Sequence, residues 1–220
     1  MTKIKICGLT RAVDVTAVNA VLPDYAGFVF AEGSRRKISV ETAVALREKL
    51  DPRVISVGVF VNQEPEFIAE LLRKKIIGMV QLHGDECAKY ITKLREMCGC
   101  EIIKAVGVGE EPPAVNVSGE VAKQSKIADF LLFDTLSPAR GGTGKPFDHR
   151  LLQNYTGLPY FLAGGLTPEN VADAVHLLSP FCVDVSSGVE TDGAKDAKKI
   201  LEFTQAVRNQ KNIKGVSSND

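Results

Sequence analysis

The sequence lacks an excess of charge of either sign. Its 220 residues include 27 Lys and Arg against 27 Asp and Glu, which gives a formal net charge of +0 at pH 7. A balanced charge offers no electrostatic basis for binding nucleic acid or an anionic membrane, so we predict neither as a partner. Local basic clusters remain available for binding a small anion.

Long apolar runs are also absent. No stretch approaches the ~20 consecutive apolar residues of a membrane-spanning helix. The first residues place Lys3 and Lys5 inside a strand-like run and contain no apolar segment of the kind found in signal peptides. We therefore expect a protein of the cytoplasm.

Cysteine is scarce and scattered, and no C-x-x-C pair occurs. The five cysteines, an odd number, are Cys7, Cys87, Cys98, Cys100 and Cys182. This pattern argues against a disulfide framework and against a zinc site, so we predict a reducing compartment and no bound metal. The G-x-G-x-x-G motif of dinucleotide-binding folds is also missing after the first strand-like run.

What the sequence does have is a regular alternation of two patterns. Short β-rich runs predict strands at 3–7, 25–30, 54–61, 77–82, 101–106, 127–134, 159–163 and 181–186. Segments of helical character between them predict helices at 13–22, 40–50, 66–75, 86–97, 115–124, 149–155, 168–178 and 194–208. Eight β-α units predict a single-domain α/β fold, a (β/α)8 TIM barrel over residues 1–208, followed by a polar tail at 209–220. A doubly wound open sheet is the alternative.

Polar residues recur at the carboxyl ends of the predicted strands. Strand residues alternate between the barrel interior and the helix layer, so Lys5 and Cys7 face inward if their isoleucine neighbours face the helices. Cys7, His83, Asp134 and Asp184 then lie at or near the face that carries active sites in such barrels. Strand eight closes onto strand one, so we predict that Lys5 pairs with Asp184. A lone cysteine is more often a buried apolar residue than a catalytic one. Cys7 is therefore a candidate catalytic residue only because it groups with the other polar residues at this face.

Two glycine-containing loops follow the last two predicted strands. Gly164 and Gly165 end one strand and precede a helix start, and Ser187 and Gly188 follow the next strand. Glycine lets backbone N–H groups approach an anion, and a helix N-terminus adds a favourable dipole. Two such loops on adjacent strands predict a phosphate site, although a Gly-Gly pair is also compatible with a simple tight turn. The late position of these loops favours the barrel over the open sheet.

Two further clusters follow strands two and six. The basic cluster at 33–37 contains Arg35 and Arg36, either of which could bind a carboxylate bidentately, although a solvated charge run is as good an interpretation. The stretch A-R-G-G-T-G-K at 139–145 departs from the Walker spacing because Pro146 follows the lysine. It is either a mobile loop over the site or a flexible surface loop.

Several motifs together resemble those of the phosphoribosylanthranilate isomerase family. The most specific are K-I-C-G-L-T at 5–10, Q-L-H-G-D-E at 81–86 and V-D-V-S-S-G-V-E at 183–190, and the resembling segments run from residue 5 to about 207. The resemblance implies a (β/α)8 barrel that converts N-(5-phosphoribosyl)anthranilate to 1-(o-carboxyphenylamino)-1-deoxyribulose 5-phosphate by an Amadori rearrangement in tryptophan biosynthesis. It implies a small-molecule phosphoribosyl substrate and neither cofactor nor metal, and it leaves open whether the protein is a monomer or a homodimer.

The resemblance also assigns roles to individual residues. It implies that Cys7 is the general base and Asp134 the general acid, and that Arg36 holds the carboxylate of the anthranilate. The substrate-binding residues that it implies are Arg36, His83, Gly142, Gly164, Gly165, Asp184, Ser187 and Gly188. Free cysteine has a pKa of ~8.5 and is mostly protonated at neutral pH, so we predict that Lys5, on the same strand face, lowers the pKa of Cys7.

Two other functions would share the glycine loops. One is another phosphosugar barrel, such as a histidine-pathway isomerase or a pentose-phosphate epimerase. An epimerase would need a metal-ligating cluster of His and Asp, and the chain has only three histidines. The other is a non-catalytic phosphometabolite-binding barrel, which has no need of Cys7 or Asp134.

Overall fold

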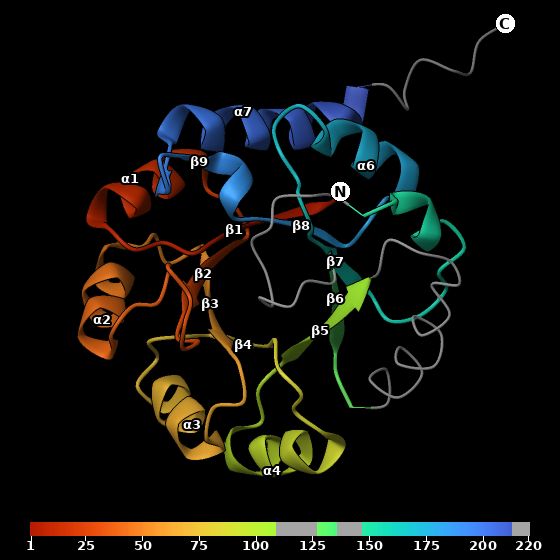
Figure 1. Cartoon of the computed structure of the whole chain (residues 1–220). Coiled ribbons are helices and arrows are strands. Elements are labelled where there is room, and N and C mark those ends of the chain that lie inside the picture. The colour runs from red at the N-terminus through yellow and green to blue at the C-terminus, as the bar shows by residue number, and fades with distance from the viewer. Residues whose placement is uncertain (109–126, 136–146, 213–220) are drawn as a thin grey trace, which may run out of the picture.

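Eight parallel strands form a closed barrel in the computed structural model, which describes residues 1–108, 127–135 and 147–212 (Figure 1). The strands are β1 (Lys3–Cys7), β2 (Tyr25–Val29), β3 (Ile55–Phe60), β4 (Met79–Leu82), β5 (Ile102–Val108), β6 (Phe130–Thr135), β7 (Tyr160–Leu162) and β8 (Cys182–Val185). Each strand pairs with the next, and β8 pairs with β1. The predicted TIM barrel is confirmed, and all eight predicted strands overlap observed ones.

Helices surround the barrel (Figure 1). They are α1 (Ala12–Val21), α2 (Val40–Lys49), α3 (Pro65–Arg73), α4 (Ala88–Cys98), α6 (Val171–Leu178) and α7 (Ala197–Arg208), with single 3-10 turns η1 (His149–Leu152), η2 (Ser187–Val189) and η3 (Asn209–Asn212). The predicted helix at 115–124 lies outside the described residues. No helix in the described parts of the chain has the length and apolar character needed to cross a membrane.

Three predicted helices differ most from the observed ones, whereas the ends of the other described helices differ by at most two residues. The segment predicted as a helix at 149–155 forms only the 3-10 turn η1. Helix α6 begins at Val171, because Asn170 closes the preceding turn by accepting from the backbone N–H of Thr167. Helix α7 begins at Ala197 rather than at residue 194, because β10 (Ala194–Lys195) pairs with β9 (Glu190–Thr191) in a short hairpin and Asp196 then caps the helix.

The apolar core has an inner and an outer layer. The inner cluster fills the barrel with side chains from its strands and comprises Tyr25, Val57, Met79, Ile103, Leu132, Phe161, Ala163 and Cys182. Ile4 and Ile6 belong to the larger cluster between strands and helices, as the alternation predicts. The same alternation turns Lys5 and Cys7 inward, so β1 places a cation and a thiol inside the barrel.

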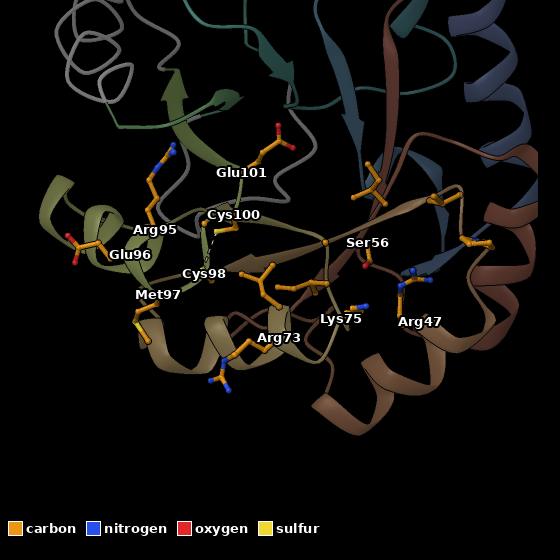
Figure 2. A pocket seen from close by; sticks show the side chains of 17 residues that line it. Arg47, Ser56, Arg73, Lys75, Arg95, Glu96, Met97, Cys98, Cys100 and Glu101 are labelled. Atoms are coloured by element: carbon orange, nitrogen blue, oxygen red, sulfur yellow. Dashed lines mark hydrogen bonds between the residues drawn. The ribbon is translucent and has the colours of Figure 1, made fainter.

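A surface hollow of about 950 Å³ lies at the amino end of the barrel (Figure 2). Its lining includes Arg47, Arg73 and Lys75, and residues that precede β4 and β5. Cys98 and Cys100 line it too, with their sulfur atoms 3.6 Å apart. None of the predicted site residues that the structure describes lines this hollow, because those residues lie at the opposite ends of the strands.

Candidate active site

Cys7 lies at the carboxyl end of β1, where two glycines make room for it. Gly27 is its partner on β2, and a Cβ atom at Gly27 would lie 2.5 Å from the Cys7 sulfur. Gly8 ends the strand with a φ of 80° and faces the Arg36 side chain, which a Cβ would approach to 2.4 Å. Only glycine therefore allows the strand to turn away at this point while Arg36 lies beside it.

The electrostatic environment of Cys7 contains opposing influences. Burial raises the pKa of the Cys7 thiol, the Lys5 and Lys195 cations lower it, and the Asp184 carboxylate raises it. The net direction is upward, so Lys5 acts in the predicted sense but burial outweighs it. Lys5 therefore lowers the pKa of Cys7 as predicted, but burial keeps the pKa of the thiol above its usual value in the substrate-free protein.

Lys5 and Asp184 form the ion pair predicted from the sequence. The Lys5 Nζ donates to Asp184 Oδ2 at 2.7 Å and to Gln81 Oε1 at 2.7 Å, and the lysine side chain is completely buried. Although burial disfavours the charged form, Asp184 and Cys7 hold the pKa of Lys5 above its usual value. The other carboxylate oxygen of Asp184, Oδ1, is buried and has no hydrogen-bond partner among the described residues. A buried acceptor of this kind is suited to receive a hydroxyl group of a ligand.

His83 and Asp134 face each other across the mouth of the barrel. His83 follows β4, and its Nε2 lies 3.5 Å from Oδ2 of Asp134 on β6. Asp134 Oδ1 accepts the backbone N–H of Thr135 at 2.8 Å, and His83 Nδ1 lies 3.0 Å from Gln81 Nε2. Hydrogen bonds thus connect Asp184, Lys5, Gln81 and His83, and His83 in turn faces Asp134.

Arg36, rather than Arg35, points toward the site. Arg35 is exposed, whereas Arg36 binds Glu190 in a bidentate pair with Nε–Oε1 and Nη2–Oε2 distances of 2.7 and 2.8 Å. These hydrogen bonds to Glu190 raise the pKa of Arg36. A guanidinium that already holds a carboxylate edge-on has the geometry for recognising a carboxylate ligand.

Glu190 also holds Lys195, a buried residue of the β9–β10 hairpin. The Lys195 Nζ donates to Glu190 Oε1 at 2.7 Å and to the carbonyl oxygen of Ser186 at 2.9 Å. The Ser186 hydroxyl in turn donates to the Cys7 carbonyl at 3.0 Å. Burial lowers the pKa of Lys195, and Glu190 opposes this effect. The hairpin therefore carries a second cation to the vicinity of Cys7.

The two predicted phosphate loops lie against each other after β7 and β8. Gly164 and Gly165 have φ angles of 83° and 69°, the left-handed region that favours glycine. A Cβ at Gly188 would lie 1.9 Å from the Leu166 carbonyl oxygen, so the absence of a side chain allows the loops to touch. Gly142, the remaining predicted substrate-binding residue, lies outside the described residues, as does the rest of 139–145.

A buried ion pair supports the loop that carries His83. Glu86 accepts from Lys104 Nζ at 3.0 Å, from the backbone N–H of Gly84 at 2.9 Å and from that of Asn62 at 2.8 Å. Lys104 faces the helix layer rather than the barrel interior. Its register partners Leu82 and Leu131 belong to the outer core, whereas Ile103 beside it belongs to the inner one.

The family described as N-(5'phosphoribosyl)anthranilate (PRA) isomerase has a model that matches residues 4–206. The chain belongs to this family. A protein named N-(5'-phosphoribosyl)anthranilate isomerase from Endomicrobium trichonymphae is 49% identical over 209 residues, covering 94% of this chain and 99% of that protein. One of the same name from Acetivibrio thermocellus is 46% identical over 216 residues, with 94% and 96% coverage.

Solved structures of the PRA isomerase family share the barrel. Phosphoribosyl anthranilate isomerase from Thermotoga maritima is 38% identical with a TM-score of 0.84, covering 95% of this chain and 100% of that one. A second, determined in complex with reduced 1-(o-carboxyphenylamino)-1-deoxyribulose 5-phosphate, is 35% identical with a TM-score of 0.81 and the same coverage. As a member of the family, the chain is an isomerase of tryptophan biosynthesis.

Three residues of this candidate site were not among the predicted ones. Gln81 shares a strand face with His83, so alternation alone could have included it. Glu190 ends the V-D-V-S-S-G-V-E motif, and its pairing with Arg36 depends on a contact between distant loops. Lys195 belongs to none of the motifs, and no local pattern marks it, because its place beside Cys7 depends on the β9–β10 hairpin.

Proposed function

We propose that this isomerase converts N-(5-phosphoribosyl)anthranilate to 1-(o-carboxyphenylamino)-1-deoxyribulose 5-phosphate by general acid and base catalysis. The observation that carries the proposal is the grouping at one end of the barrel. A thiol at Cys7, a carboxyl group at Asp134 and the paired glycine loops after β7 and β8 all lie at the carboxyl ends of the strands. Each group supplies one requirement of the rearrangement.

Asp134 is the proposed acid of the first step. Its proton passes to the ring oxygen of the ribose as the C1′–O bond breaks, and the lone pair of the anilino nitrogen forms a C=N bond. The product is a cationic Schiff base, and Asp134 is left as a carboxylate. The nearby His83 Nε2, 3.5 Å from Oδ2, is placed to stabilise that new charge.

Cys7 is the proposed base of the second step. Its thiolate removes the C2′ proton, and the C–H electron pair forms the C1′=C2′ bond of an enolamine while the nitrogen is neutralised. The enolamine then takes a proton at C1′ while its O2′ hydroxyl releases a proton, and the C2′–O2′ group becomes the ketone. Without substrate, burial raises the pKa of the thiol. The positive charge of the Schiff base then acts together with the charges of Lys5 and Lys195. These three charges favour the thiolate at the stage when the C2′ proton has to be removed.

The remaining residues bind the two ends of the substrate. Arg36 takes the anthranilate carboxylate in the bidentate mode that it now uses with Glu190. The backbone at Gly164, Gly165, Ser187 and Gly188 receives the phosphate, aided by the closeness of the two loops. Together these contacts place the ribose between its two ends, over Cys7 and Asp134.

Three more residues complete the proposed substrate site. Asp184 Oδ1, buried without a partner among the described residues, accepts a ribose hydroxyl. His83 binds the substrate from the side of the barrel mouth opposite Asp184. Gly142, which lies outside the described residues, completes the set by resemblance.

The catalytic unit proposed here is residues 1–208. The barrel elements run from Lys3 in β1 to Arg208 in α7, and η3 follows at Asn209–Asn212. We place the protein in the cytoplasm, where five free thiols persist in reduced form.

A fluorescence assay that follows consumption of phosphoribosylanthranilate tests the proposal. We expect the wild-type protein to be active, and Cys7→Ser and Asp134→Asn each to lose about 10²- to 10⁴-fold in kcat, the usual contribution of an acid or base. Cys87→Ser and Asp192→Asn are matched controls at exposed positions and keep full activity. Wild-type turnover with only other phosphosugars as substrates would overturn the proposed reaction. Full activity of Cys7→Ser or Asp134→Asn would overturn the assigned roles.

A further inference from the structure

We propose that Lys5, acting through Gln81, fixes His83 in the tautomer that carries its hydrogen on Nε2, so that His83 presents a donor to Asp134. The tautomer follows from hydrogen-bond logic alone, whereas its catalytic consequence rests on the function proposed above. Lys5 and Gln81 are positioning residues in this arrangement, because they act through His83.

The first link fixes the orientation of an amide. A lysine ammonium group is a donor and cannot accept a hydrogen bond. The Lys5 Nζ lies 2.7 Å from Gln81 Oε1 inside the barrel, and both side chains are buried. The amide oxygen must therefore face Lys5, and the amide NH2 group must face the other way. The pair with Asp184 holds Lys5 charged in this position, at 2.7 Å.

The second link fixes the tautomer. Gln81 Nε2 lies 3.0 Å from His83 Nδ1, and an amide NH2 group can only donate. His83 Nδ1 must accept this hydrogen bond, so it carries a lone pair rather than a hydrogen. A neutral imidazole then has its hydrogen on Nε2. The orientation of one buried lysine thus determines which ring nitrogen is the donor.

The third link directs this donor at the proposed acid. His83 Nε2 is 3.5 Å from Asp134 Oδ2, while Oδ1 is already occupied by the backbone N–H of Thr135. A separation of 3.5 Å is longer than a normal hydrogen bond, so the contact is weak in the substrate-free protein. It strengthens when Asp134 gives up its proton and becomes negative. An interaction that tightens as charge develops lowers the barrier rather than merely improving substrate binding.

The loop beneath His83 keeps the ring in this geometry. Gly84, the next residue, donates its N–H to Glu86, and its carbonyl accepts from Lys104 at 2.6 Å. A Cβ at Gly84 would lie 2.4 Å from Asn62 Oδ1, so the backbone there is tightly enclosed. The His83 backbone N–H is itself bound to the Phe60 carbonyl at 2.8 Å.

Nitrogen-15 NMR of histidine-labelled, full-length protein without substrate reads the tautomer directly. With only three histidines, the His83 signals are assigned by their loss in His83→Gln, and His176, which is exposed, serves as an internal reference. We expect an unprotonated Nδ1 and a protonated Nε2. Gln81→Glu reverses this pattern, because a carboxylate bound to Lys5 accepts from His83 rather than donating to it. A protonated Nδ1 in the wild type, or a pattern unchanged by Gln81→Glu, would overturn the proposed tautomer.

Kinetics test the catalytic consequence with a conservative pair. His83→Leu removes the donor, and we expect kcat to fall about 10- to 100-fold, the value of a hydrogen bond to a charged group, with KM changing much less. His83→Gln retains an N–H donor near the position of Nε2 and recovers part of this loss. Equal kcat values for the Leu and Gln variants would overturn the role of the donor. An inactive wild-type protein would instead overturn the proposed function, while leaving the NMR result to decide the tautomer.

Discussion

Two buried lysines on the barrel strands show how one kind of ion pair serves two purposes. Lys5 faces inward and pairs with Asp184 at 2.7 Å, next to Gln81 and Cys7. Lys104 faces outward and pairs with Glu86 at 3.0 Å beneath the loop that carries His83. Both side chains are almost completely buried and each contacts a carboxylate. The inner pair acts on the electrostatics of the reacting groups, whereas the outer pair holds the backbone that positions one of them.

The partners of the two lysines explain this difference. Lys104 donates to the backbone carbonyls of Leu82 and Gly84 as well as to Glu86. Its hydrogen bonds therefore hold the backbone of the loop after β4 in place. Within the described ranges Lys5 donates only to side chains, and one of these acceptors, Asp184, keeps an oxygen without a hydrogen-bond partner there. A buried pair that leaves an acceptor unused is poorly optimised for stability and well suited to bind a ligand.

Among the substitutions that test this comparison, Lys5→Met has the largest expected effect. Removing the cation leaves Asp184 buried without its partner, withdraws a charge that favours the Cys7 thiolate and frees the Gln81 amide to rotate. We expect unfolding free energy to fall by about 3–5 kcal/mol, the usual cost of breaking a buried pair, and kcat to fall about 100-fold. Urea unfolding and turnover per folded molecule measure the two effects. Turnover within a factor of two of wild type would remove Lys5 from the chemistry.

Lys104→Met is the matched control for this comparison. It makes the same substitution in a pair of the same kind, and we expect a similar loss of about 3–5 kcal/mol in unfolding free energy. Turnover per folded molecule falls only a few-fold, because the loop loses support but the reacting groups keep their charges. If Lys104→Met lowered turnover as much as Lys5→Met, the division between inner and outer pairs would be wrong.

A smaller effect is expected on the thiol itself. The difference in thiolate absorbance between the wild type and Cys7→Ser, followed against pH, isolates Cys7 from the other four cysteines. Burial raises the pKa of Cys7, so we expect its titration to be shifted upward from that of a free cysteine. Lys5→Met moves this titration to still higher pH, because a neighbouring cation is lost, and Lys104→Met leaves it in place. Titration of Cys7 below pH 8 would contradict the conclusion that burial outweighs the effect of the neighbouring lysines on the pKa of Cys7.

Strand positions and inward-facing polar residues could be predicted because both depend on local pattern. The alternation along β1 correctly separated Ile4 and Ile6 from Lys5 and Cys7, and the order of strands placed Asp184 beside Lys5. The carboxyl ends of parallel strands converge, so Cys7, His83 and Asp134 could be assigned to one face.

The net shift in the pKa of Cys7, and the contacts between residues far apart in the sequence, could not be predicted from local patterns. The pKa of Cys7 depends on how deeply the thiol is buried, which a strand pattern does not measure. Lys195 approaches Cys7 only because the β9–β10 hairpin replaces the first residues of the predicted helix at 194–208. Arg36 and Glu190 meet across 154 residues of sequence, and no local pattern indicates their contact.

The most direct test of the account follows the proton at C2′ of the substrate. Phosphoribosylanthranilate carrying deuterium at that carbon is converted in ordinary water, and the product is analysed by mass spectrometry. If Cys7 removes this atom as a deuteron, the label exchanges with solvent and is depleted from the product, and Cys7→Ser slows the conversion about 10²- to 10⁴-fold. Complete retention of deuterium at C1 of the product, formed at an undiminished rate by Cys7→Ser, would indicate direct transfer between the carbons and contradict the proposed base.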